Sequence, residues 1–380
     1  MNLLVVNGPN LNLLGTREPS IYGTATLADL EAQWQTLGDR LGISITAFQS
    51  NHEGTLIDAI HEARTTFDGI VLNAGALTHY SLALADAVVA CELPFVEIHI
   101  SNVHEREEWR HHSVLSEHAD AVIVGRGTDG YLNAIAHLHA SLTHPPVTRQ
   151  YGTHGSAMLD LRTPSSQGPH PAVILIHGGY WRRIWLRDIM DPMAVDLLDH
   201  GFATVNIEYT TGPSSFPAAL DDVNDAVSWV LDNATNFGID ADRVILVGHS
   251  AGGYLALQTG HSRDDLAGIV GLGSVVDLPS VKLDVADGDP AEAFLGGDAV
   301  AIPNVWDAAA IKGTPQIPTK LIHGTDDVDV NPIHAEMYVQ RTMGQAALVV
   351  LGGVGHMELI DPADPSWPSV VAAVEGFVSR

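Results

Sequence analysis

Short runs of almost continuously apolar residues recur along the first part of the chain, and a helical pattern separates each run from the next. The runs are Leu3–Val6, Ile43–Phe48, Gly69–Leu72, Phe95–Ile100 and Ala121–Val124. One intervening stretch places Leu30, Trp34 and Leu37 on one helical face, with Thr26 at the N-cap position. Strands that are apolar on both faces and alternate with helices predict a parallel sheet covered by helices on both sides.

A polar, proline-containing stretch at residues 146–153 interrupts this pattern and is expected to be a linker. Apolar runs then resume at residues 172–179, 202–209, 243–253, 267–273, 319–327 and 347–356. A chain of 380 residues is also longer than one hydrophobic core usually serves. We therefore expect two α/β domains. Residues 1–145 would form a flavodoxin-like, five-stranded parallel sheet, and residues 154–380 a larger doubly wound sheet.

Composition excludes several classes of partner. The 46 acidic residues outnumber the 18 basic ones, and the resulting net charge of −28 would repel the phosphates of a nucleic acid. No apolar run is long enough to span a membrane, and the N-terminus lacks a secretion signal. Cys91 is the single cysteine, so an internal disulfide is impossible and a reducing cytoplasm is expected. The partners expected are small-molecule substrates.

Polar residues gather where the strands of the first domain end, which is the edge at which open parallel sheets bind their ligands. These residues are Asn7, Asn10, Asn12, Asn73, His79, His99 and Ser101. The loop after the first strand adds Arg17 and Tyr22. Because this loop is rich in glycine and proline, it is a candidate mobile lid.

These residue types suit an elimination through an enolate. A guanidinium beside a phenol favours the phenolate, so Tyr22 with Arg17 can remove a proton next to a carbonyl. His99 can protonate the leaving group, with Glu97 or another acceptor orienting its ring. The asparagines would hold substrate hydroxyls, an enolate oxygen or an ordered water.

Four motifs in this domain resemble those of the type II 3-dehydroquinate dehydratases. They are "NGPNLNLLGTREPSIYG" (7–23), "QSNHEG" (49–54), "NAGALTHYSLALADA" (73–87) and "EIHISNVHEREEWRHHS" (97–113). The resemblance covers about residues 1–142. It implies conversion of 3-dehydroquinate to 3-dehydroshikimate without a metal or organic cofactor, and a homo-oligomer of trimers assembled into dodecamers. The chain departs from the family pattern at Ala74 and Leu77, where a proline and an aromatic residue are usual.

The resemblance also implies a role for individual residues. Tyr22 would accept the proton, His99 would donate one, and Arg17 would support Tyr22 from the lid. Asn12 would help to stabilise the enolate through a water molecule. The substrate-binding positions would be Asn73, His79, Ile100, Ser101 and Arg110, and Asp86 would reach the site of a neighbouring subunit.

The many histidines of the fourth motif do not indicate a zinc site. The pattern H-E-x-x-H beginning at His104 would need a second histidine at position 108, where the chain has Glu108. Four histidines are expected to be solvated or to lie at an interface: His104, His111, His112 and His118. A phosphoryl-receiver domain, a rival at the level of fold, would need an aspartate in place of Asn73. A flavodoxin would need a phosphate-binding loop in place of "NGPNLNLLG".

The second domain contains "GHSAG" (248–252) between an apolar run and a helical stretch, which is the context of a nucleophile elbow. Ser250 is predicted to be the nucleophile, His356 the base and Asp327 the acid that orients it, with Asp326 and Asp329 as alternatives. The predicted oxyanion hole consists of the backbone amides of Gly178, Gly179 and Ala251.

Residues 152–380 resemble the α/β-hydrolase superfamily, and "HGGYW" (177–181) looks most like its kynurenine formamidase and carboxylesterase branch. The expected activity is hydrolysis of a small ester or amide. A formamide, a small acyl ester and an ester of quinate or shikimate all remain open as substrates. The chain is thus expected to be bifunctional. The alternative is a dehydratase with a non-catalytic, hydrolase-like appendage that serves assembly.

Overall fold

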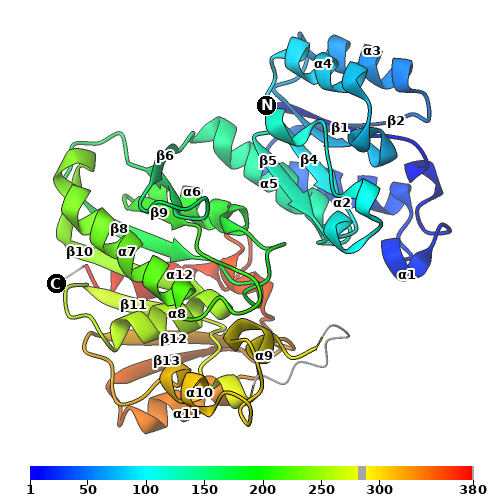
Figure 1. Ribbon diagram of the computed structural model, residues 1–380. Coiled ribbons are helices and arrows are strands. Elements are labelled where there is room, and N and C mark those ends of the chain that lie inside the picture. The colour runs from blue at the N-terminus through cyan, green and yellow to red at the C-terminus, as the bar shows by residue number, and fades with distance from the viewer. Residues whose placement is uncertain (281–287, 379–380) are drawn as a thin grey trace. The chain divides into compact units, whose positions relative to one another are not determined.

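The computed structural model describes residues 1–280 and 288–378, and the chain forms two compact units, Met1–Thr143 and His144–Arg380 (Figure 1). The first unit has a parallel sheet in the order β2-β1-β3-β4-β5, with strands β1 Asn2–Asn7, β2 Ser44–Gln49, β3 Gly69–Asn73, β4 Phe95–His99 and β5 Ala121–Val124. All five predicted strands are present. The expected flavodoxin-like fold is therefore confirmed.

Helices cover both faces of this sheet. The helices are α1 Pro19–Tyr22, α2 Leu27–Leu41, α3 Glu53–Ala63, α4 Leu82–Cys91 and α5 Asp129–Thr143. Alternate residues of β1 divide the core, since Leu3 packs with α2 and α5 whereas Leu4 packs with α3 and α4. Thr26 caps α2 in a reciprocal pair with Asp29, as its position predicted.

Short 3-10 turns follow the carboxyl ends of the strands, and three residues of the predicted site lie on them: Asn12, His79 and Arg110. These turns are η1 Leu11–Leu13, η2 Gly75–His79, η3 Val103–Glu105, η4 Glu108–Arg110 and η5 Ser116–His118. Because the strands are parallel, their carboxyl ends lie along one sheet edge, and Asn7 of β1 is directly beside Asn73 of β3. This edge is therefore where the candidate site is assembled.

The second unit has a mixed sheet in the order β13-β12-β11-β10-β8-β9-β7-β6. Its strands are β6 Val147–Gln150, β7 Met158–Arg162, β8 His170–Ile176, β9 Ala203–Ile207, β10 Ile239–His249, β11 Gly268–Leu272, β12 Thr319–Gly324 and β13 Ala346–Leu351. The six predicted strands are present and form the parallel part. β6 and β7 were not predicted, and β7 pairs antiparallel with both β6 and β9.

The expectation that residues 146–153 form a linker is corrected by the structure. These residues contain β6, which is hydrogen-bonded to β7 as the last strand of the sheet. The segment reads as a linker because every residue of β6 is exposed, so no apolar pattern marks it. The second sheet therefore begins almost directly after the first unit ends.

Helices also cover both faces of the second sheet (Figure 1). Those described are α6 Asp191–Asp199, α7 Ala218–Asn233, α8 Ala251–Gly260, α9 Pro290–Leu295, α10 Pro303–Ala309, α11 Ile333–Arg341 and α12 Trp367–Glu375. The 3-10 turns are η6 Arg187–Met190, η7 Ala234–Phe237, η8 Leu278–Ser280 and η9 Met357–Ile360. Helices α7 and α8 pack on the face that contains Ile174, and α6 and α12 pack on the face that contains Val173.

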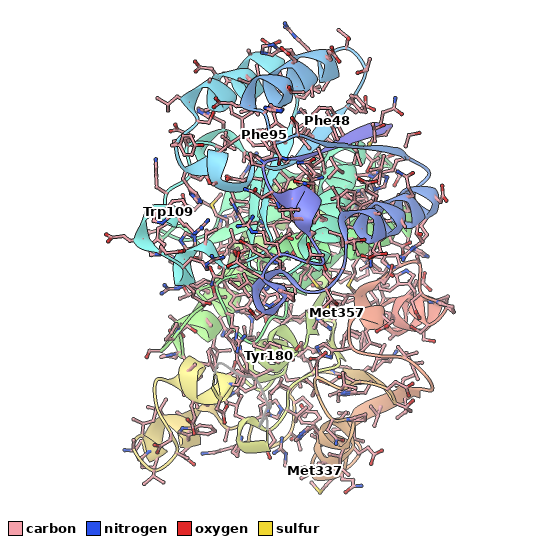
Figure 2. The ribbon with its side chains drawn as sticks, turned by 90° about the vertical axis from the view of Figure 1, so that its right-hand side faces the viewer. Phe48, Phe95, Trp109, Tyr180, Met337 and Met357 are labelled. Atoms are coloured by element: carbon pink, nitrogen blue, oxygen red, sulfur yellow. The ribbon has the colours of Figure 1, made fainter. Side chains whose placement is uncertain are left out.

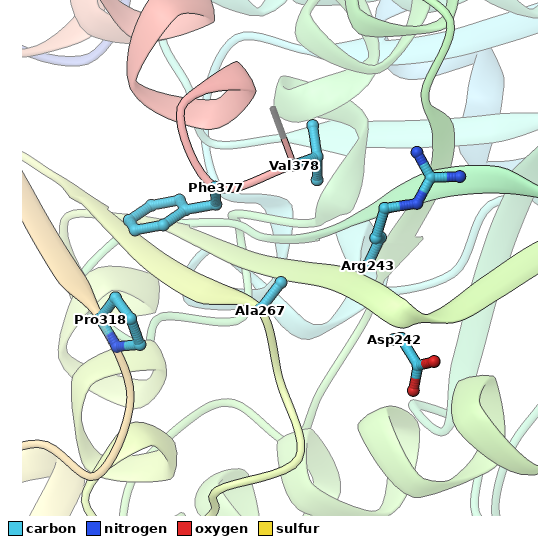
Figure 3. A pocket seen from close by; sticks show the side chains of 6 residues that line it. All are labelled: Asp242, Arg243, Ala267, Pro318, Phe377 and Val378. Atoms are coloured by element: carbon cyan, nitrogen blue, oxygen red, sulfur yellow. The ribbon is translucent and has the colours of Figure 1, made fainter. Parts of the chain in front are cut away.

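A pocket lies at the amino ends of the strands of the second sheet (Figure 3). It is lined by Asp242, Arg243, Ala267, Pro318, Phe377 and Val378. These residues lie at the sheet edge opposite the one that carries Ser250, so the pocket is separate from the predicted triad. No helix in the described parts of the chain is both long and apolar enough to cross a membrane.

Candidate active sites

Two asparagines at the ends of β1 and β3 belong to a buried hydrogen-bond network in the first unit. The Tyr131 hydroxyl donates to Asn7 Oδ1 at 2.6 Å, and Asn73 Nδ2 donates to the Tyr131 oxygen at 2.8 Å. Asn73 Oδ1 accepts the amide of Gly75 at 3.2 Å. Burial raises the pKa of Tyr131, so this phenol stays protonated and serves as a donor. The side chain of Asn73, a predicted substrate-binding residue, is therefore also fixed by hydrogen bonds to Tyr131 and Gly75.

His99, the predicted acid, is paired with a buried carboxylate. His99 Nε2 donates to Glu97 Oε1 at 2.8 Å, and the two residues are 7% and 0% exposed. The pairing fixes the plane of the imidazole ring and leaves Nδ1 as the nitrogen that can face a substrate. This contact agrees with the orienting role that the sequence suggested for Glu97.

Three hydroxyl groups complete the surroundings of Glu97. Ser116 Oγ donates to Oε2 at 2.6 Å, Ser113 Oγ lies 2.8 and 3.0 Å from the two carboxylate oxygens, and Thr78 Oγ1 also donates. Burial alone would raise the pKa of Glu97, but His99 and the hydroxyl donors overcome this effect and lower it to about 2. Glu97 therefore stays ionised.

Tyr22, the predicted base, contacts two arginines. The guanidinium carbon of Arg17 lies 5.0 Å from the centre of the Tyr22 ring, and Arg17 Nε pairs with Glu18 at 3.2 Å. Arg106 Nη1 instead donates to the Tyr22 hydroxyl at 3.3 Å and to Ser101 Oγ at 3.4 Å. The contact with Tyr22 raises the pKa of Arg106. The structure thus adds Arg106 to the site.

Sequence reasoning missed Arg106 although it lies within the motif 97–113. The only available signal was its position among histidines and glutamates, where it reads as one more charge of a solvated turn. In the structure its guanidinium bridges Tyr22 on the loop after β1 and Ser101 after β4. This bridge brings the predicted base to the sheet edge that carries His99.

Three side chains line up beyond His99. The His79 ring is stacked at 6.3 Å from the His99 ring, and its Nδ1 contacts the carbonyl of His112 at 2.7 Å. The indole of Trp109 is exposed (Figure 2). It meets the His79 ring edge-on at 5.1 Å, and the Arg110 guanidinium lies 4.1 Å over it. Mainly because of burial, the pKa of His79 is lowered. His79 and Arg110, both predicted to bind substrate, are thus joined through Trp109.

The other predicted residues of the first site occupy varied environments. Ile100 is buried, with its carbonyl bound to the amide of Gly127 at 3.0 Å. Asn12 is exposed in η1, and Asp86 is exposed on α4. Four histidines are exposed, as the sequence predicted: His104, His111, His112 and His118.

In the second unit, Ser250 occupies a sharp turn between β10 and α8. Its backbone has φ 55° and ψ −118°, a region that a non-glycine residue enters only under strain. The flanking glycines are needed for space. A Cβ at Gly248 would lie 2.3 Å from the carbonyl of Gly252, and a Cβ at Gly252 would lie 2.3 Å from the carbonyl of Ile176. This is the geometry of a nucleophile elbow.

The predicted acid and base of the second site are in contact. His356 Nδ1 donates to Asp327 Oδ2 at 2.7 Å. The same oxygen lies 3.1 Å from His323 Nε2, and Oδ1 accepts the amides of Asp329 and Val330 at 3.0 and 2.8 Å. These donors outweigh burial and hold the pKa of Asp327 well below its ordinary value. Asp327 is therefore an ionised partner for His356.

The two alternative acids have other contacts. Asp326 is exposed and accepts from the hydroxyl of Thr325 at 2.8 Å, and Asp329 accepts from the hydroxyl of Tyr180 at 2.6 Å. Within the described residues, ligand atoms that could share a metal ion occur in Asp327, Asp329 and His356, all within 4.8 Å of one another. Each of the three already accepts or donates a hydrogen bond within the protein.

His249 connects the elbow to the loop that carries His356. Its Nε2 donates to the His356 carbonyl at 3.0 Å, and the two rings lie 4.5 Å apart. Burial, assisted by the neighbouring His356, lowers the pKa of His249 to about 3, so this ring stays neutral. Because His249 directly precedes Ser250, the nucleophile and the base are brought to the same edge of the sheet.

The predicted oxyanion loop follows β8 and lies against the elbow. A Cβ at Gly178 would lie 2.8 Å from Ser250 Cβ, so the loop backbone could not approach the nucleophile with any other residue there. Gly179 has φ 106°, and a Cβ there would lie 2.2 Å from the Trp185 side chain. Ala251 is the first residue of α8, where backbone amides point out of the helix end. These amides suit stabilisation of an oxyanion.

Comparison with known proteins finds a different family match for each of the two units. The family model described as dehydroquinase class II matches residues 1–139, and a second model, described as BD-FAE, matches residues 159–341. A catabolic 3-dehydroquinase from Verticillium alfalfae is 60% identical over 133 residues, which are 35% of this chain and 89% of that protein. A 3-dehydroquinate dehydratase from Bacillus pumilus is 57% identical over 137 residues, which are 36% of this chain and 93% of that protein.

Solved structures resemble the second unit in fold. An acetyl ester-xyloside bifunctional hydrolase from Caldicellulosiruptor lactoaceticus has a TM-score of 0.51 at 20% sequence identity. The likeness covers 62% of this chain and 96% of that one. At this level of identity the comparison establishes an α/β-hydrolase fold, which agrees with the fold predicted from the sequence.

Proposed function

The chain belongs to the dehydroquinase class II family through its first unit, and we propose that this unit dehydrates 3-dehydroquinate to 3-dehydroshikimate. One observation carries the assignment of the site. Arg106 contacts Tyr22 and also Ser101, which follows His99 by two residues, so a base and an acid occupy one sheet edge. This unit matches nearly the whole length of relatives that are named for this reaction.

The reaction needs a base, an acid and a group that stabilises an enolate. Tyr22, as a phenolate beside Arg17 and Arg106, removes the proton next to the ketone, and the electrons move into the carbonyl to form an enolate. Asn12 stabilises the enolate oxygen through a water molecule. His99, protonated against ionised Glu97, then gives its proton to the departing hydroxyl, and water leaves. No step uses a metal or an organic cofactor.

The remaining polar groups bind the substrate. The backbone amides of Ile100 and Ser101 would face its carboxylate, and Arg110 would bind a hydroxyl. Arg110 is positioned for this role by Glu107, whose carboxylate lies 2.7 Å from its Nε. Asn73 and His79 would complete the pocket.

Appearance of the conjugated enone from 3-dehydroquinate, followed by its ultraviolet absorbance, tests the first activity. Tyr22→Phe should abolish the signal because a benzene ring cannot accept the proton. Ser250→Ala should leave it intact, since Ser250 belongs to the other unit. Full activity in Tyr22→Phe would refute the assignment of the base.

We propose that the second unit is a serine hydrolase that acts on a small ester or amide. Ser250 would attack the carbonyl carbon while His356 takes its proton. The amides of Gly178, Gly179 and Ala251 would bind the oxyanion, and His356 would pass the proton to the departing alcohol or amine, which leaves the acyl group on Ser250. Water, losing its proton to His356, would then attack this acyl group and release the carboxylic acid and free Ser250. The match to the BD-FAE family and the contact between His356 and Asp327 support this proposal. An ester is favoured because structural relatives such as the Caldicellulosiruptor lactoaceticus hydrolase are named for ester cleavage.

A fluorophosphonate probe separates this proposal from the alternative of a non-catalytic appendage. The probe should label the wild-type chain and should not label Ser250→Ala. An unlabelled wild type would favour the appendage. A panel of 4-nitrophenyl acetate, N-formylkynurenine and a caffeoyl ester of quinate then distinguishes a small acyl ester, a formamide and a quinate ester as substrates.

We also propose that the chain works as a cytoplasmic homo-oligomer, based on trimers and extending to a dodecamer. The surface around Asp86 supports this proposal, because Tyr80, Leu82 and Val89 are 64%, 68% and 51% exposed there. Apolar groups gathered on and beside one helix favour a partner surface. Native mass spectrometry of the full chain tests the proposal, and a monomer at micromolar concentration would contradict it.

A further inference from the structure

The side chain of Tyr180 connects the loop after β8 to the loop after β12. Its hydroxyl donates to Asp329 Oδ1 at 2.6 Å. Burial, with the nearby carboxylate of Asp329, raises the pKa of Tyr180, so the phenol is protonated and acts as a donor at neutral pH. Asp329 is in turn attached to the catalytic acid, because its amide donates to Asp327 Oδ1 at 3.0 Å. Two hydrogen bonds thus lead from the oxyanion loop to the triad.

The oxyanion loop has a backbone that needs such restraint. Gly179, Tyr180 and Trp181 have φ angles of 106°, 55° and 56°, so three consecutive residues are in the left-handed region. Glycine adopts this region freely, whereas tyrosine and tryptophan do so only when their surroundings hold them. Trp181 is held by the core, since its ring stacks on Phe294 at 4.2 Å. Tyr180 is only partly buried, and its hydroxyl is bound by Asp329.

The chemistry of the loop depends on the same geometry. A Cβ at Gly178 would lie 2.8 Å from Ser250 Cβ, so the loop already touches the nucleophile. Oxyanion donors act only when they lie about 2.7–3.1 Å from the developing charge. Relaxation of Tyr180 toward an ordinary φ would turn the peptide that joins it to Gly179, and with it the adjoining amides.

We propose that the Tyr180–Asp329 hydrogen bond is a positioning device that keeps the oxyanion amides aligned with Ser250 and with the acid–base pair. The inference rests on the proposed hydrolase function. Tyr180 and Asp329 are positioning residues, because they act through the loop and through Asp327 and do not take part in bond making. The bond joins the segment that stabilises the oxyanion to the segment that orients the base, so the two stay aligned during acyl transfer.

A double-mutant cycle on the full chain tests the device. The variants are Tyr180→Phe, Asp329→Ala and the two combined, and the readouts are the rate constant for fluorophosphonate labelling and kcat and KM for 4-nitrophenyl acetate. Each single variant should lower the labelling rate and kcat by about 10- to 100-fold, as expected for a sub-ångström displacement of oxyanion donors. The double variant should lose no more than the worse single variant, and KM should change by less than about twofold.

Three further variants exclude a general loss of structure. Tyr338→Phe removes a comparable buried hydroxyl, which contacts His261 at 2.8 Å on another part of the unit, and should label at the wild-type rate. Val328→Thr alters a 93% exposed residue between Asp327 and Asp329 and should also be unaffected. Asp329→Asn keeps an acceptor oxygen and should recover part of the rate lost in Asp329→Ala.

Additive losses in the cycle would overturn the inference, because they would show that the two side chains act independently. A rise in KM at unchanged kcat would also overturn it, since Tyr180 would then bind substrate directly. If the wild-type chain is neither labelled nor active, the proposed hydrolase function fails and this inference fails with it. If the wild-type chain is labelled but the variants match it, only the positioning role is refuted.

Discussion

The substitution Glu97→Gln should destabilise the first unit and also remove part of the acid dependence of its stability. Glu97 is fully buried, and its hydrogen-bond partners in the described chain are donors: the His99 ring and the hydroxyls of Thr78, Ser113 and Ser116. A carboxylate accepts from all of them. A glutamine must direct its NH₂ group at one of these donors, and it carries no negative charge.

The size of the effect follows from the pKa of Glu97. This pKa lies at about 2, against 4.5 for an ordinary glutamate, which corresponds to a stabilising free energy on the order of 3 kcal/mol. Because the pKa is lowered in the folded state, this contribution is present in full above about pH 4.5 and is lost as the pH falls toward 2. Glu97→Gln should therefore cost on the order of 3 kcal/mol at pH 7 and little below pH 2.

Amide hydrogen exchange of the full-length chain measures this effect within one unit. The slowest amides of β3 and β4 report the free energy of unfolding of the first unit at each pH. As a control, Ser116→Ala removes one hydrogen bond of 2.6 Å and should cost only about 1 kcal/mol. The reasoning is refuted if Glu97→Gln costs less than that control, or if it shows the same loss of protection between pH 4.5 and 2 as the wild type.

Three further predictions concern catalysis. Gly178→Ala should slow labelling of Ser250 by at least about 100-fold, because the new Cβ lies 2.8 Å from Ser250 Cβ, while enone formation is unchanged. Arg106→Ala should lower kcat for enone formation by about 100-fold, since Tyr22 loses its hydrogen-bond partner, and an unchanged kcat would remove Arg106 from the site. Asp327→Asn should slow labelling by about 10,000-fold, and a small effect would indicate a different acid.

The sequence predicts the parallel parts of both sheets because each central strand is buried on both faces. β1 and β3 appear as nearly unbroken apolar runs, β4 is interrupted only by Glu97 before its terminal His99, and the helices between these strands have a clear period. The strands β6 and β7 at the end of the second sheet escaped prediction. β6 is exposed throughout, and strand pairing there comes from backbone hydrogen bonds that leave no hydrophobic pattern.

The site residues were predictable where a backbone constraint or a strand end determines them. Ser250 is flanked by glycines that only a tight turn needs, and His99 is the last residue of β4. Contacts between side chains of separate loops were not predictable. Arg106 reaches Tyr22 across 84 positions and Tyr180 reaches Asp329 across 149, and neither spacing has a period that a linear sequence could reveal.

Helix α5 determines where the chain leaves the first unit. A Cβ at Gly130, near its start, would touch Ile98 toward the carboxyl end of β4, and a Cβ at Gly69, the first residue of β3, would touch Leu138. The helix therefore returns the backbone to the amino ends of the strands before the first unit ends at Thr143. A different protein joined after Thr143 would therefore be attached at the end of the first sheet that lies away from His99. This position suits the construction of engineered fusions.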